Sequence, residues 1–140
     1  MLRKYHESDI ERIIEIENNT LKHTLGLDFY KNDLSNPLAM HYVYEIEDKI
    51  LGFISSYFDG EIIEILNFCI DEEYQSQGYG SKLLNEFFKE FEACSSILEV
   101  RSSNNKAISL YEKCGFKTIR IRKNYYSNGE DALYMQKIID

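Results

Sequence analysis

Apolar residues near the N-terminus recur with the period of a helix, after a short alternating segment. Residues 2–5 predict a short strand, and isoleucines on successive turns predict a helix from about residue 9 to residue 18. Ser8 and Glu11 have the S-x-x-E spacing of a capping box at the start of that helix. Residues 20–38 follow without a clear period, which predicts a loop and a short helix.

The middle of the chain is rich in β-branched and aromatic residues, which is typical of strands. The strings EDK and DG interrupt it as turns would. The pattern therefore predicts three antiparallel strands in a meander, at about 40–46, 50–57 and 61–70.

A glycine-bearing string, YQSQGYG, follows the third of these strands and opens an amphipathic helix. Because one face of this helix is apolar and the other is charged, we expect it to pack on a sheet. The apolar face consists of Leu83, Leu84, Phe87, Phe88 and Phe91. The remaining predicted elements are a strand at 96–101, a helix at 104–116 stopped by Gly115, and strands at 117–122 and 132–139.

This order of elements predicts an α/β fold in one domain, residues 1–140, with β-α-β crossovers in its middle. Hydrophobic residues make up 44% of the sequence and aromatic residues 14%, as in a folded globular chain. The N-terminus lacks the long apolar stretch of a signal peptide, and no window approaches the roughly 20 apolar residues of a membrane span. We therefore expect a cytoplasmic protein.

Net charge and the placement of cysteine and histidine argue against several classes of function. A formal net charge of −8 argues against binding to nucleic acid or to an anionic membrane, because both need a basic face. Cys69, Cys94 and Cys114 form no C-x-x-C pair, which predicts free thiols in or just below the surface. The three histidines show no metal spacing, so we expect surface or subsurface positions for them and no metal site.

The glycine string is suited to an anion. Gly78 and Gly80 allow backbone N–H groups to converge just before a helix N-terminus, where a phosphate would be stabilised. A Walker loop would need an earlier glycine and a lysine in place of Ser81, and a dinucleotide fingerprint would need Gly or Ala in place of Leu83. Neither motif fits, and a glycine turn without a ligand is the alternative.

The string Gln75-Ser76-Gln77-Gly78-Tyr79-Gly80 resembles the Q/R-x-x-G-x-G/A loop of the GNAT superfamily of acetyl-CoA-dependent N-acetyltransferases. Downstream, LEVRSSNNKAISLYEKCGF and RKNYYSNGEDALYM are similar to the branch that acetylates protein N-termini, which includes the ribosomal-protein alanine N-acetyltransferases. The resemblance covers about residues 61–135. It implies acetyl-CoA as co-substrate and a mixed, mostly antiparallel central sheet flanked by helices, with the glycine loop before the central helix.

The resemblance also assigns two catalytic residues. Glu99, in LEVR, takes the position of the general base, and Tyr111, in LYEKCGF, takes that of the general acid. Without the resemblance, Glu99 would be interpreted as a solvated strand residue and Tyr111 as a core aromatic residue.

Coenzyme contacts are implied in the same way. The family pattern places the acetyl group and the pantetheine arm against one strand and the pyrophosphate against the glycine loop. Asn104 would contact the pantetheine through its side chain, and its alternative role is to cap the following helix. The implied strand and loop residues are Phe68, Cys69, Ile70, Ser76, Gln77, Gly78, Tyr79, Gly80 and Ser81.

The string NYYSNGED is the implied wall of the acceptor site. Tyr125 and Tyr126 would contact the acceptor peptide, while Glu130 and Asp131 would favour a basic or ammonium substrate. The alternative is that the Asn-Gly turn and its tyrosines only close the last hairpin.

Three functions are compatible with these residues. The first is acetylation of a protein N-terminus, the second is acetylation of a small amine or a lysine side chain, and the third is acyl-CoA binding without turnover. The presence of both Glu99 and Tyr111 favours an enzyme. The branch usually carries a Pro-Trp-Ser string in residues 20–28, and here the sequence LKHTLGLDF leaves the acceptor open.

Overall fold

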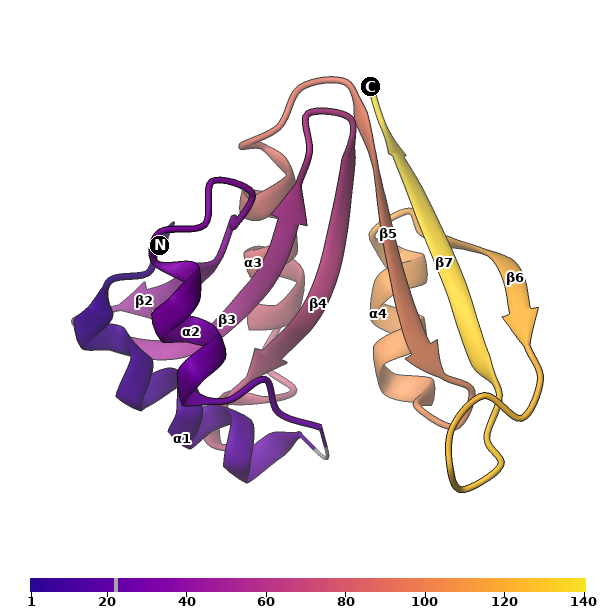
Figure 1. Cartoon of the computed structure of the whole chain (residues 1–140), viewed down its shortest axis with the longest axis horizontal. Helices are drawn as coiled ribbons and strands as arrows, with labels where there is room; N and C mark the ends of the chain where they lie inside the picture. Colours follow the sequence, from indigo (N-terminus) through magenta and orange to yellow (C-terminus); the bar gives the residue numbers. More distant parts are fainter. Residues whose placement is uncertain (22) are drawn as a thin grey trace.

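The computed structural model describes residues 1–21 and 23–140, and its centre is one seven-stranded sheet (Figure 1). The strand order is β1-β2-β3-β4-β5-β7-β6, and the strands pair antiparallel except for β4 with β5. The strands are β1 (Leu2–Lys4), β2 (Tyr42–Ile46), β3 (Lys49–Phe58), β4 (Ile62–Ile70), β5 (Cys94–Arg101), β6 (Lys117–Arg122) and β7 (Ala132–Ile139).

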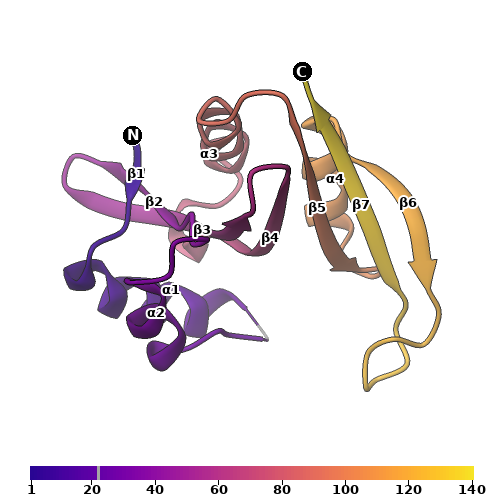
Figure 2. The ribbon, with the colours of Figure 1, turned by 45° about the horizontal axis from the view of Figure 1, so that its top comes forward.

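Helices cover both faces of the sheet. The helices are α1 (Ile10–Thr20), α2 (Leu27–Asp33), α3 (Tyr79–Phe88) and α4 (Asn105–Lys113), with short 3-10 helices η1 (Glu7–Asp9) and η2 (Glu72–Tyr74). Figures 1 and 2 show α1 and α2 on one face, and α3 and α4 on the other. Within the described residues, none of these helices has the length and apolarity that crossing a membrane requires.

Each face of the sheet has its own hydrophobic core. Ile13 and Phe53 belong to the core under α1 and α2, and Leu83 and Phe87 belong to the larger core under α3 and α4. The apolar stripe of α3 is buried as its period predicts. The predicted fold class, a mixed and mostly antiparallel sheet flanked by helices, is confirmed.

The predicted capping box at Ser8 and Glu11 is wrong, because the chain turns earlier. Asp9 Oδ2 accepts the His6 backbone N–H at 2.7 Å, and the Asp9 N–H donates to the His6 carbonyl at 2.9 Å. Arg3 holds the same carboxylate, with its Nη1 2.8 Å from Asp9 Oδ2. This arrangement places η1 before α1 and leaves Ser8 inside the 3-10 turn.

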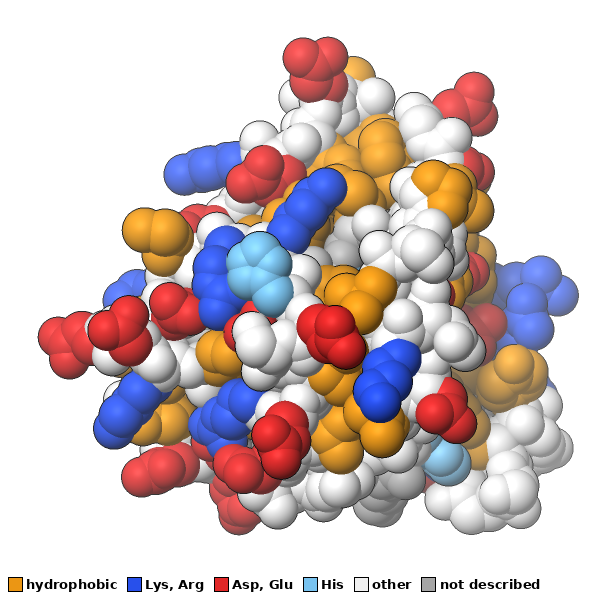
Figure 3. Space-filling view, turned by 60° about the vertical axis from the view of Figure 1, so that its left-hand side comes forward, with side chains coloured by type: hydrophobic (Ala, Val, Ile, Leu, Met, Phe, Trp, Pro, Cys, Tyr) orange, Lys and Arg blue, Asp and Glu red, His pale blue; other side chains and the backbone are white. Residues whose placement is uncertain are grey.

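Charged side chains are interspersed on the side of the N-terminal elements. Figure 3 brings this side forward and shows acidic, basic and apolar groups alternating over short distances. Some of these charges are paired, as in the contact of Arg3 Nη2 with Glu45 Oε2 at 2.6 Å. The net charge of −8 is therefore not gathered into one acidic field on this side.

The two strands at the centre of the sheet separate soon after they meet. β4 and β5 pair in parallel only where Ile62, Ile63 and Glu64 face Ser95, Ser96 and Ile97. Beyond this short ladder β4 continues to Ile70 along β3, and β5 continues to Arg101 along β7. Figure 1 shows the resulting V-shaped gap between the two strands.

His41 lies deeper than the sequence suggested, with only 2% of its surface exposed. Its Nε2 is 2.7 Å from Asp33 Oδ2, and its Nδ1 accepts the Ser56 backbone N–H at 3.0 Å. Tyr57 donates its hydroxyl to the same Asp33 oxygen at 2.9 Å. Because Nδ1 must accept, the imidazole is neutral with its proton on Nε2. This polar cluster ties α2 to β2 and β3.

This cluster makes stability depend on pH. Burial lowers the pKa of His41 below its ordinary value, and hydrogen bonding to Asp33 only partly opposes this effect. The unfolded histidine, with a pKa of about 6.5, therefore binds protons that the native one resists. We expect the free energy of unfolding to fall as the pH drops below about 6.5, by at most about 1.4 kcal/mol per pH unit.

Urea denaturation at pH 7.5, 6.5 and 5.5 measures this slope. His41→Gln removes the titrating group and should flatten the slope, whereas His6→Gln, at an exposed position, should preserve it. An unchanged slope in His41→Gln would contradict the assignment.

Candidate active site

The separation of β4 and β5 produces a cleft of about 1230 Å³. Its walls come from both strands, from the glycine loop, from α4 and from the segment between α1 and α2. Most residues predicted to bind the coenzyme line this cleft: Phe68, Cys69, Ile70, Ser76, Gly78, Tyr79, Gly80, Ser81 and Asn104. Gln77 belongs to the same loop but does not line the cleft.

The glycine loop is held in an unusual backbone conformation. Gly78 has φ +85°, and a Cβ added there would meet no atom within 4 Å, so the surface above it is open. Ser76 also has a positive φ, 65°, which is uncommon for a residue with a side chain. Gly80 permits close packing instead, since a Cβ there would lie 3.0 Å from Leu110 Cδ2. Open N–H groups above a glycine at a helix start fit the phosphate of a coenzyme.

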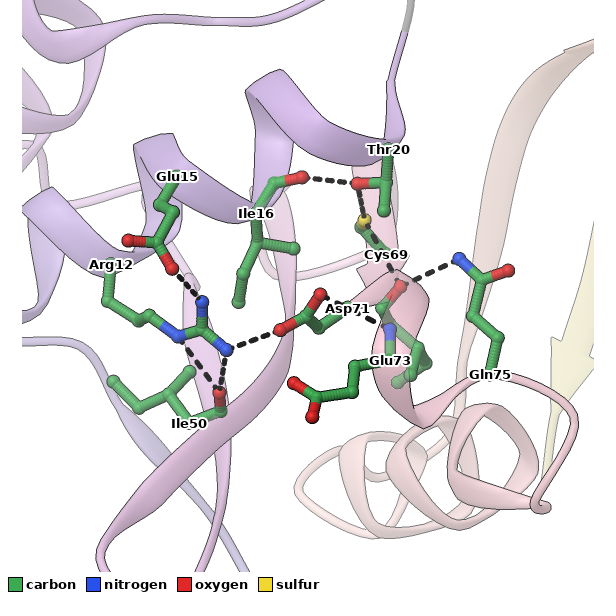
Figure 4. Close-up of polar contacts among 10 residues, drawn as sticks. Arg12, Glu15, Ile16, Thr20, Ile50, Cys69, Asp71, Glu73 and Gln75 are labelled. Carbon is green, nitrogen blue, oxygen red and sulfur yellow. Dashed lines mark hydrogen bonds and ion pairs between the residues drawn. The ribbon is translucent and has the colours of Figure 1, made fainter.

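Polar contacts fix the end of β4, from which the loop begins (Figure 4). Gln75 Nε2 donates to the Ile70 carbonyl at 2.9 Å, so the loop is tied back to the strand. Arg12 on α1 donates to Asp71 Oδ2 at 2.5 Å and to the Ile50 carbonyl at 3.0 Å. These bonds join α1, β3 and the loop at one point.

A β-bulge shapes β4 where it enters the cleft. Ser55 of β3 faces Asn67 and Ser56 faces Ile65, so Leu66 has no partner on β3. Phe68 then contributes to the core on the α4 face, and Cys69 to the core on the α1 face. Bulges commonly redirect side chains beside active sites.

Cys69 is a buried thiol in the wall of the cleft. Its side chain is 4% exposed and its Sγ contacts Thr20 Oγ1. Burial raises the pKa of Cys69 to about 11, so the thiolate is scarce at neutral pH. The predicted free state of Cys69, Cys94 and Cys114 is confirmed.

Glu99 and Tyr111 approach the cleft from opposite faces of the sheet. On β5, Leu98 and Val100 are buried in the core that contains Tyr111, so the Glu99 side chain points to the other face. Both residues line the cleft. Glu99 is exposed, and its Oε1 is 3.8 Å from Arg122 Nε, a distance at which an ion pair contributes little.

Tyr111 occupies a mostly apolar position. It is 7% exposed, and its ring packs on Phe68 and Phe116 with centroids 6.1 and 5.6 Å apart. Burial raises the pKa of Tyr111 well above that of a free phenol. Its hydroxyl is therefore protonated throughout the physiological range and is available as a donor.

Asn104 is the N-cap of α4. Its Oδ1 accepts the Ala107 backbone N–H at 3.2 Å, so the capping alternative is confirmed. The residue also lines the cleft, and its contact with pantetheine stays a prediction.

The predicted acceptor residues divide into two groups. Tyr126 lines the cleft, whereas Tyr125 is 49% exposed outside it. Glu130 Oε2 accepts from Arg101 Nη1 at 2.9 Å, and Asp131 accepts the Asn124 backbone N–H at 3.0 Å. Both carboxylates thus support the loop between β6 and β7, and their contact with a substrate stays a prediction.

Arg101, at the end of β5, connects the two sides of the cleft. Its guanidinium stacks on the Tyr126 ring at 3.9 Å, pairs with Glu130, and contacts the ring nitrogen of His23 between α1 and α2. The sequence showed Arg101 only as part of LEVR and gave no signal for these partners.

Glu17 is a second residue that the sequence did not single out. It is fully buried on α1, and within residues 1–21 and 23–140 its carboxylate has no cationic partner. Its carboxylate accepts the backbone N–H groups of Leu25 and Gly26, the Tyr30 hydroxyl, and the Asn67 amide, at 3.1 to 3.3 Å. Glu17 therefore fixes the segment before α2 against the bulge of β4.

The described residues contain no cluster of side chains that could bind a metal ion. Across residues 1–21 and 23–140, His, Cys, Asp and Glu side chains do not gather in groups of three or more that suit a metal ion.

The bulged strand β4 and the glycine loop at the start of α3 thus form a site suited to a phosphate-bearing ligand. Residues 7–116 match the Acetyltransferase (GNAT) family. Because this match covers most of the chain, the chain belongs to the GNAT acetyltransferase family, whose members are acetyl-CoA-dependent N-acetyltransferases.

Similar proteins span nearly the whole chain. It is 37% identical to a candidate ribosomal protein bS18-alanine N-acetyltransferase of Bacillus subtilis, over 96% of this chain and 92% of that protein. It is 30% identical to an N-alpha-acetyltransferase of Saccharolobus solfataricus, over 97% and 91%. The crystal structure of the ribosomal-protein-alanine N-acetyltransferase of Escherichia coli superposes with a TM-score of 0.87 at 28% identity, covering 100% of this chain and 94% of that one.

Substitution of Glu17 tests whether its carboxylate holds the segment between α1 and α2 in place. Glu17→Ala leaves four donors without their acceptor, and we expect a loss of roughly 3 kcal/mol or more in the free energy of unfolding. Glu11→Gln, at an exposed position on the same helix, should change it by less than about 0.5 kcal/mol. Chemical denaturation measures both, and equal stability of the two variants would exclude a structural role for Glu17.

Proposed function

We propose that this protein acetylates the N-terminal α-amine of a protein, such as a ribosomal protein. The observation that carries the proposal is the cleft between β4 and β5, which has an anion-binding loop at its coenzyme side and Glu99 on the opposite face. The names of the Bacillus, Escherichia and Saccharolobus relatives support the same class of acceptor.

The chain offers a consistent set of coenzyme contacts. Backbone groups of residues 76–81 would hold the pyrophosphate, and the edge of β4 at 68–70 would hold the acetyl and pantetheine parts. Beyond Glu64 this edge has no β5 partner, so its peptide groups, apart from the Ile70 carbonyl that accepts from Gln75, would bind an extended chain. The coenzyme supplies the activated acetyl group.

Glu99 and Tyr111 have complementary roles in this proposal. Glu99 takes the proton from the acceptor ammonium, directly or through water, so that the neutral amine attacks. Tyr111 would face the departing sulfur from the other side of the gap. Burial raises the pKa of Tyr111 above that of a thiol, so full proton transfer to the sulfur is uphill; the hydroxyl stabilises the departing sulfur as a hydrogen-bond donor, and any phenolate formed takes its proton back from solvent.

The α-amine is the easier acceptor for a site with one exposed carboxylate. An unperturbed α-amine titrates near 7.7 to 8.0 and lysine near 10.4, so the α-amine is neutral several hundredfold more often at neutral pH. A weak base such as Glu99 therefore suffices for a protein N-terminus. In this proposal the acceptor would lie against the part of the cleft lined by Thr20, Leu21, His23, Leu25 and Tyr126.

Acetyl-CoA turnover, followed as free thiol, tests the proposal. The substrates are a basic peptide that begins with alanine, the same peptide blocked at its N-terminus but containing lysine, and a polyamine. We expect turnover only with the free N-terminus, a loss of about 100-fold or more in Glu99→Gln, and a marked loss in Tyr111→Phe. Product mass locates the acetyl group.

The matched control is Glu112→Gln, which removes an exposed carboxylate from α4 outside the cleft and should leave turnover unchanged. Turnover confined to lysine or the polyamine would replace the proposal with a side-chain or small-amine acetyltransferase. Tight coenzyme binding without turnover of any amine would favour a binding module.

The phosphate loop can be tested separately. Gly78→Asp places a carboxylate among the loop amides, where it repels a pyrophosphate and also strains a backbone with φ +85°. We expect acetyl-CoA binding to fall at least tenfold by calorimetry, since the loss of one charge-assisted contact has about this effect. Gly129→Asp, at a φ of +88° in the β6–β7 loop and not itself part of the cleft lining, is the control for backbone strain. Equal affinity of Gly78→Asp and wild type would contradict the assignment.

A further inference from the structure

Lys106 occupies the first turn of α4 and reaches across to the glycine loop. Its Nζ donates to Gln75 Oε1 at 3.2 Å and to Ser76 Oγ at 3.4 Å. All three residues line the cleft. The ammonium thus stands beside the loop whose open amides fit a phosphate.

The contacts of Lys106 are neutral. Among the described residues it forms no ion pair with a carboxylate, although the chain carries 24 acidic residues against 16 basic ones. Gln75 is itself held by the Ile70 carbonyl, so the ammonium is oriented by a side chain fixed to β4. A cation oriented by neutral oxygens retains its charge for an anion.

Other lysines near the loop are directed differently. Lys82, in the first turn of α3, lies over the Tyr79 ring with its Nζ 5.4 Å from the centroid and does not line the cleft. Lys113 also lines the cleft, but from the last turn of α4, about two helical turns from Lys106. Among the described lysines, Lys106 is the one whose ammonium donates hydrogen bonds to the loop.

We propose that Lys106 binds the pyrophosphate of the coenzyme together with the loop amides. This inference rests on the proposed function and adds a charged contact from α4 to a site otherwise made of backbone groups. In an acidic protein such a contact offsets the repulsion of a polyanionic substrate. The ammonium also ties α4, and with it Tyr111, to the bound coenzyme.

Calorimetry of Lys106→Gln with acetyl-CoA tests the inference. We expect Kd to rise about tenfold and to depend less on salt, because one charge-assisted contact is lost. Lys106→Arg should recover most of the affinity, and Lys82→Gln, which removes the same charge outside the cleft, should bind like wild type. Lys106 is exposed, so the variants should retain the wild-type melting temperature.

Comparing acetyl-CoA with two further ligands, dephospho-CoA and acetyl-pantetheine, shows which phosphate Lys106 contacts. Dephospho-CoA keeps the pyrophosphate and should show the same loss in Lys106→Gln, whereas acetyl-pantetheine, which has no pyrophosphate, should bind both proteins equally. A loss that disappears with dephospho-CoA would place Lys106 at the 3′-phosphate and overturn the assignment.

Failure of this inference is distinguishable from failure of the proposed function. Equal acetyl-CoA affinity of wild type and Lys106→Gln would overturn the role of Lys106 alone. A wild-type protein that binds no coenzyme would overturn both.

Discussion

The short pairing of β4 with β5 is the constraint on which the rest of the molecule depends. Three residue pairs hold the strands together, and beyond Glu64 each follows a different neighbour. Peptide groups at the separated edges need other partners, because unpaired buried N–H and C=O groups are costly. A cleft that admits an extended ligand meets this need. The contacts of Arg12 and Gln75 hold the end of β4 against α1, β3 and the glycine loop.

The sheet also separates the chemistry of its two faces. On the α4 face, the glycine loop, Lys106 and the buried Tyr111 surround one side of the gap; on the α1 face, Glu99 and Tyr126 lie near water. A buried phenol retains its proton and so offers a hydrogen-bond donor, while Glu99 on the other face is open to an incoming amine. The alternation of β5 alone places Glu99 across from the core that holds Tyr111.

Local patterns predicted the elements well and the long-range contacts poorly. The α3 stripe and the meander have strong periods, and Gly115 stops α4 as its position suggests, with φ +98°. His41 was misplaced because its burial depends on Asp33 and Ser56, which reach it from α2 and β3. Glu17, Arg101 and Lys106 act through partners far away in sequence, and no spacing rule brings such partners together. The motif resemblance found Glu99 and Tyr111, but their separation by the sheet required the fold.

The segment between α1 and α2 is ordered although it lacks the Pro-Trp-Ser string. Leu21 and Leu25 of this segment pack against the core that contains Tyr30 and Phe53. Glu17 adds polar contacts, because it accepts the backbone N–H groups of Leu25 and Gly26 while it holds Asn67 at the bulge of β4. Asn67 is adjacent to Phe68, so one buried carboxylate couples Leu25 and Gly26 to the strand proposed to hold the acetyl group. Under the proposed function, an acceptor that contacts Leu25 would therefore act on this strand as well.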